Sequence, residues 1–133
     1  MSQNRRVAAD LDELYTEVEL LLRRYSPPFS ERSGGISGKR DYQLWSEKDV
    51  VIEGRKKSEV YFAGVIRQKA YVGFYYMPVY TDPERRDLFS PELLRLLKGK
   101  SCFHLKRLGA EMLLEIESAL DEGVELYRRR GWV

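Results

Sequence analysis

The stretch EVYFAGVIRQKAYVGFYYM, residues 59–77, decides the fold of this chain. Both of its halves, residues 59–67 and 70–77, are rich in Val, Tyr and Phe, which favour pleated strands. Only a short polar turn separates them, and a connection this short joins antiparallel strands. The stretch therefore predicts a hairpin at the centre of an antiparallel sheet, with Phe62 and Phe74 buried.

Further strands and helices are expected on both sides of this hairpin. Apolar residues recur at three- and four-residue steps from Val7 to Tyr25, which predicts a helix that Pro27 ends. We expect the other strands at residues 42–46, 50–53 and 101–106, and a long final helix at residues 110–130. The chain is thus predicted to be one α+β domain over residues 1–133. It has an antiparallel sheet of about five strands, with the N-terminal and C-terminal helices packed on one face.

Two proline pairs and a glycine-rich segment mark the connections. In Asp82-Pro83 and Ser90-Pro91, a capping side chain precedes a proline at the first helical position, so each pair predicts a helix start. The segment SGGISG, residues 33–38, is interpreted as a flexible loop.

Composition limits the classes of protein to consider. The chain is 43% hydrophobic and 33% charged, with a formal net charge of +2. It contains no run near the ~20 apolar residues that span a membrane. The first residues are polar with no apolar run after them, so we expect no secretory signal. Cys102 is the only cysteine, which excludes a disulfide framework within the chain. These features predict a cytoplasmic protein with no membrane partner.

The strand pair around Gly-Phe-Tyr, residues 73–75, and the Lys-Gly-Lys turn at 98–100 before an aromatic strand resemble the YdhG-like family of domains of unknown function. The similarity in element order runs from Leu11 to Arg130. The resemblance implies a compact α+β fold. Because some family members are described as frataxin-like iron carriers, it also implies iron as a cofactor or cargo and iron–sulfur assembly proteins as partners. The Arg-Arg-Arg-Gly-Trp ending, residues 128–132, departs from the family pattern.

An acidic row on the first helix is one candidate site. Asp10, Glu13 and Glu17 share one helical face, and carboxylate oxygens are ligands for hard cations such as iron. Such a row could bind iron weakly. A charged, solvated outer face is the more common role of this pattern.

A second candidate site is a tyrosine-lined face of the sheet. Tyr71, Gly73 and Tyr75 alternate on one face of their strand, and the glycine could leave space for a ligand. Cys102 and His104 likewise share one face of the last strand, as soft metal ligands or as a nucleophile and base. The alternatives are tyrosines that pack in the core and an inert thiol.

Basic pairs recur, for example Lys39-Arg40 and Arg85-Arg86, but acidic residues are interspersed among them. A nucleic-acid partner is therefore not expected. No set of acid, base and nucleophile is recognisable, so we do not expect an enzyme. The sequence predicts a non-catalytic binding protein. It is either a frataxin-like carrier that binds iron weakly, or a module that binds a small molecule or a protein on the tyrosine-lined face.

Overall fold

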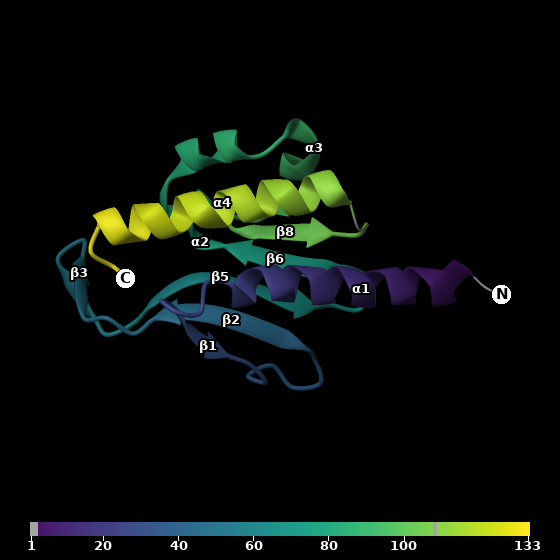
Figure 1. The fold of residues 1–133 in the computed structure, drawn as a ribbon, viewed down its shortest axis with the longest axis horizontal. Helices are drawn as coiled ribbons and strands as arrows, with labels where there is room; N and C mark the ends of the chain where they lie inside the picture. Colours follow the sequence, from purple (N-terminus) through teal and green to yellow (C-terminus); the bar gives the residue numbers. More distant parts are fainter. Residues whose placement is uncertain (1–2, 108) are drawn as a thin grey trace.

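Residues 59–77 form the predicted hairpin at the centre of a six-stranded antiparallel sheet (Figure 1). The computed structural model describes residues 3–107 and 109–133, with side chains from residue 10 onward. The strand order is β1-β2-β5-β6-β8-β7. The strands are β1 (Ser30–Arg32), β2 (Asp41–Ser46), β5 (Val60–Arg67), β6 (Val72–Tyr76), β7 (Leu97–Lys98) and β8 (Cys102–Leu105).

The strand predicted at residues 50–53 does not join this sheet. It forms β3 (Val50–Ile52), which pairs only with β4 (Arg55–Lys57) in a separate two-stranded hairpin. Glu53 and Gly54 both have positive φ, so the chain reverses between them and Val50 comes to face Lys57. Strand β2 pairs instead with β1 on one side and with β5, the first half of the central stretch, on the other. The prediction that residues 50–53 form a strand of the central sheet was therefore wrong.

The helices are α1 (Gln3–Arg23), α2 (Met77–Thr81), the 3-10 helix η1 (Pro83–Leu88), α3 (Pro91–Leu94) and α4 (Ala110–Arg129). Ser90 caps α3 as predicted, because its hydroxyl accepts a hydrogen bond from the Leu93 amide at 3.3 Å. Asp82-Pro83 also precedes a helix start as predicted, since η1 begins at Pro83, but the Asp82 side chain makes no capping bond and instead accepts from Arg130 at 2.6 Å. Within the described residues, no helix is long and apolar enough to cross a membrane.

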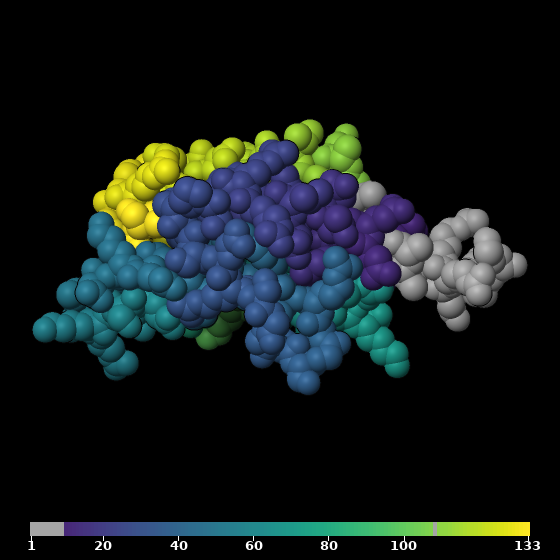
Figure 2. Space-filling view, turned by 60° about the horizontal axis from the view of Figure 1, so that its bottom comes forward, coloured from purple at the N-terminus to yellow at the C-terminus, as the bar shows by residue number. Residues whose placement is uncertain are grey.

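Helices α1 and α4 lie side by side over one face of the sheet, as predicted (Figures 1 and 2). Just after α1, Arg24 pairs with Glu117 of α4 at 2.8 Å, and the Tyr25 hydroxyl lies 2.5 Å from Asp121. Phe62 and Phe74 are both buried beneath the helices, with no exposed side-chain surface. This confirms the fold class expected from the sequence.

Alternation along the strands divides the sheet into two faces. Tyr42, Val65, Phe74 and Phe103 share the row that faces the helices, and all four are buried. The contacts of Arg23 with Tyr42 and of Phe89 with Phe103 lie on this helix-covered face. Along each strand, the residues directly before and after these four point to the opposite face of the sheet, which we call the open face.

Candidate functional site

The open face brings together all five residues of the tyrosine-lined site predicted from the sequence. In the register of β6 and β8, Gly73 lies opposite His104 and Tyr75 lies opposite Cys102. The Tyr71 ring stacks on the His104 imidazole, with centroids 3.8 Å apart and planes 12° from parallel. Except for the buried Gly73, these side chains are half-buried. The two separate candidates from the sequence therefore form one cluster.

The cluster continues onto two neighbouring strands, where the sequence analysis missed it. Gln43 of β2 and Gly64 of β5 lie in the same cross-strand row as Tyr75. The Tyr61 hydroxyl donates to the Gln43 side-chain oxygen at 2.6 Å, and Trp45 meets the Tyr61 ring edge-on at 5.1 Å. Period-two alternation against the buried Phe62 could have placed Tyr61 on the open face.

Space above the glycines of the open face is already filled. A Cβ atom on Gly73 would lie 3.2 Å from the Tyr75 ring and 3.5 Å from the Cys102 sulfur. Above Gly64, a Cβ atom would collide with the Gln43 side chain and the Tyr61 hydroxyl. The gap expected beside Gly73 is thus occupied by Tyr75 itself. A ligand on this face would lie against the rings rather than in a hole between them.

Two lysines lie near His104 at one end of the open face. Partial burial, followed by the nearby Lys98 and Lys106, lowers the pKa of the His104 imidazole. Burial raises the pKa of Tyr75 to about 12. The imidazole thus favours its neutral form, and the two lysines supply positive charge at this end of the face.

The chemistry of a nucleophile and base is not assembled here. Burial raises the pKa of the Cys102 thiol, and the neighbouring Tyr75 hydroxyl only partly offsets this. The Cys102 thiol contacts the Phe103 carbonyl at 4.0 Å and the Tyr75 hydroxyl, and neither of these groups is a base. A neutral thiol without an adjacent base is a poor nucleophile.

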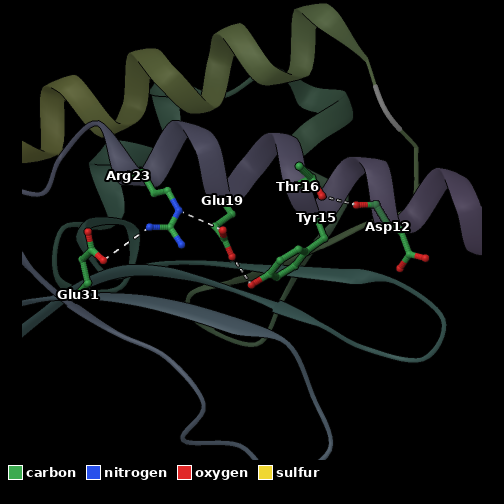
Figure 3. Close-up of polar contacts among 6 residues, drawn as sticks. All are labelled: Asp12, Tyr15, Thr16, Glu19, Arg23 and Glu31. Carbon is green, nitrogen blue, oxygen red and sulfur yellow. Dashed lines mark hydrogen bonds and ion pairs between the residues drawn. The ribbon is translucent and has the colours of Figure 1, made fainter.

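The acidic row on α1 is more exposed to solvent than the cluster on the open face. Asp10, Glu13 and Glu17 are all exposed, and none forms an ion pair with another residue of the described ranges. Their neighbours on the same helix are engaged instead. In Figure 3, Glu19 accepts from the Tyr15 hydroxyl at 2.7 Å and from Arg23 at 3.1 Å.

Among residues whose side chains are described, no group of three or more His, Cys, Asp or Glu is arranged to hold a metal ion. The row therefore gains no ligand from a second element, and water would have to complete any coordination shell. Iron binding by this row stays a prediction from the sequence.

Comparison of the chain with protein-family models, with curated proteins and with solved structures found no match. The resemblance to YdhG-like domains therefore stays a prediction.

Proposed function

We propose that this protein is a non-catalytic binding protein, and that the open face of its sheet binds a small planar organic ligand. One observation supports this most directly: strand register gathers the rings of Tyr71, Tyr75 and His104 on the face opposite the helices. Half-buried aromatic side chains combine apolar area with polar edges, which suits reversible contact with a ring compound.

The lysines beside His104 support an anionic group on the ligand. Lys98 and Lys106 are both exposed and lie close enough to lower the pKa of the imidazole. A ligand with a negatively charged group would offset this local positive charge while its ring contacts Tyr71 or His104. We therefore propose a planar ring compound with an anionic group.

A small ligand suits this face better than a polynucleotide. Polynucleotide binding relies on many cationic contacts along a phosphate backbone. At the other end of the face, Arg32 covers the Trp45 ring at 4.5 Å and is neutralised by Glu59 at 2.6 Å and Glu47 at 3.4 Å. The positive charge is thus local, and a single anionic group is sufficient to match it.

The test uses adenosine 5'-monophosphate as a probe with a planar ring and an anionic group. Its two halves are adenosine, which lacks the phosphate, and ribose 5-phosphate, which lacks the adenine ring. The intact probe should raise the melting temperature and shift the ring signals of Tyr71 and His104 in NMR spectra. Each half should bind more weakly. Absence of any shift at these rings, with this probe and with a wider set of aromatic acids, would contradict the proposal.

Matched variants sharpen this test. Tyr71→Ala removes a ring and should weaken binding by about tenfold, since stacking on one aromatic residue contributes about 1–3 kcal/mol. Tyr71→Phe keeps the ring and should bind like the parent. Lys48→Gln, a charge change on an exposed residue between β2 and β3, is the control for general electrostatics.

We also propose a cellular location and a family for this protein. The single cysteine and the absence of a long apolar run in the sequence support a cytoplasmic location. The Gly-Phe-Tyr strand and the Lys-Gly-Lys turn support membership in the YdhG-like family.

A further inference from the structure

A second candidate site lies between the β3–β4 hairpin and the α2–η1 segment. The structure has a surface cavity of about 580 Å³ there. Its lining comes from three parts of the chain: Ile52 and Glu53 of the hairpin, Tyr80 and Arg86 of the α2–η1 segment, and Lys100 after β7. A cavity of this size is within the range of small-molecule sites.

The charged groups of the cavity point to an anionic ligand group. Lys100 and Arg86 are exposed, and neither forms an ion pair with any residue of the described ranges. The Lys100 ammonium lies 5.3 Å from the centre of the Tyr80 ring, and that tyrosine is 46% exposed. Two cations beside an exposed ring can hold a carboxylate while the ring contacts the rest of the ligand.

Glu53 adds an opposite charge at the same cavity. It is the one residue other than glycine with positive φ in the described ranges, at 51°. This left-handed conformation is unfavourable for a glutamate, so the hairpin turn places its carboxylate here against the backbone preference. A ligand that also carries an ammonium group would satisfy this carboxylate. The buried Val79 and the half-buried Ile52 supply apolar contact.

Both walls of the cavity are attached to the C-terminal segment. Arg130 donates to Asp82, between α2 and η1, at 2.6 Å. The Trp132 carbonyl accepts from the Ser46 hydroxyl, where the chain enters the β3–β4 hairpin, at 2.5 Å. Figure 1 shows the C-terminus beside β3 at this end of the molecule. Arg130 and Trp132 thus connect the C-terminal segment to both walls.

We propose that this cavity binds a small zwitterion of the α-amino acid type. Its carboxylate would contact Lys100 and Arg86, its ammonium group Glu53, and its side chain the Tyr80 ring and the apolar wall. The site is separate from the open face, because Lys100 contacts Tyr80 while Lys98, at the other end of the same turn, lies near His104.

The experiment compares three probes by calorimetry and NMR: L-phenylalanine, phenylacetate, which lacks the ammonium group, and phenethylamine, which lacks the carboxylate. L-Phenylalanine should bind, and each of the other two should bind at least about tenfold more weakly, the effect of one charged hydrogen bond. NMR shifts should appear at Tyr80 and Ile52. Shifts at Tyr71 and His104 instead would assign the binding to the open face and overturn this proposal.

Single variants then test the assigned contacts. Lys100→Gln and Arg86→Gln should each weaken L-phenylalanine binding by about tenfold, and Glu53→Gln should remove the preference over phenylacetate. Lys69→Gln, an exposed change in the β5–β6 turn, is the matched control and should bind like the parent. The altered residues are exposed, so unfolding should not confuse the result, and circular dichroism checks this. No binding of L-phenylalanine, or undiminished binding by Lys100→Gln, would overturn the proposal.

Discussion

Gly123 of α4 lies so close to Phe62 of β5 that a Cβ atom on the glycine would be 2.7 Å from the phenylalanine ring. The same Cβ atom would also lie 2.7 Å from the Tyr76 hydroxyl. That hydroxyl donates to the Ala119 carbonyl of the same helix, so it is not free to move away. The close packing of α4 on the sheet therefore depends on the missing side chain at position 123.

Gly123→Ala should destabilise the protein by about 1–3 kcal/mol, the usual cost of overpacking a core. Helix propensity alone predicts the opposite sign, since alanine is favoured over glycine by about 1 kcal/mol inside a helix. Urea unfolding measures the difference. Ser118→Ala, at an exposed position on the same helix, is the control. A stabilised Gly123→Ala protein would show that the Phe62 ring can move aside.

Phe62 itself should be among the most costly residues to truncate. Its ring stacks on Phe29 with centroids 4.3 Å apart and meets Tyr127 edge-on at 5.1 Å. Phe62→Ala should lower the free energy of unfolding by about 3–5 kcal/mol, because a large cavity remains. Leu114→Ala, 64% exposed on α4, should change it by less than about 1 kcal/mol. Similar losses for both variants in urea unfolding would contradict this packing.

The sequence predicted the elements whose pattern is strong and local. Residues 59–77 alternate clearly and are long enough to be recognised, whereas β1 and β7 span only three and two residues. A strand this short carries no readable period, and its position depends on the neighbour it pairs with. Gly123 shows the same limit, because helical periodicity does not indicate which residue must lack a side chain.

The candidate site was predictable in its parts but not in its assembly. Alternation placed Tyr71 with Tyr75, and Cys102 with His104, each pair on one face of its own strand. Only the register between β6 and β8 shows that the two pairs meet. No sequence pattern predicted the cavity beside Lys100, because its lining residues come from separate parts of the chain.

His104 should have a lowered pKa and should make stability depend on pH. Partial burial, then Lys98 and Lys106, favours the neutral imidazole, so the unfolded chain binds the proton more readily. The stabilising contribution is therefore fully present above the unfolded pKa of about 6.5 and is lost as pH falls through the folded pKa. His104 is the only histidine, so its NMR titration is unambiguous. Lys98→Gln should raise the measured pKa, whereas Lys48→Gln should leave it unchanged.

Cys102 should behave as a structural thiol. Burial raises its pKa, and the Tyr75 hydroxyl opposes that shift. The native protein should therefore react with iodoacetamide at neutral pH at least about tenfold more slowly than the unfolded chain, since only the thiolate reacts. Tyr75→Phe removes the opposing hydroxyl and should slow the reaction further. Labelling of the native protein as fast as that of the unfolded chain would contradict the raised pKa.

The acidic row on α1 allows a direct test of the iron prediction. Asp10, Glu13 and Glu17 are exposed, and no residue from another described element joins them as a metal-binding group. Three carboxylates in water leave most of a coordination shell to solvent, so affinity should be micromolar at best, about −8 kcal/mol. If the row binds iron as the sequence predicts, ferrous iron should release heat with the parent and none beyond background with the triple variant Asp10→Asn, Glu13→Gln, Glu17→Gln.

The triple variant is informative because its stability should be almost unchanged. Exposed charges contribute little to folding, so its free energy of unfolding should stay within about 1 kcal/mol of the parent. Calcium, also a hard cation, is the control for non-specific attraction to carboxylates. Iron-specific heat that disappears in a fully folded triple variant would make the row a real iron site. The open face would then be a second binding surface rather than the principal one.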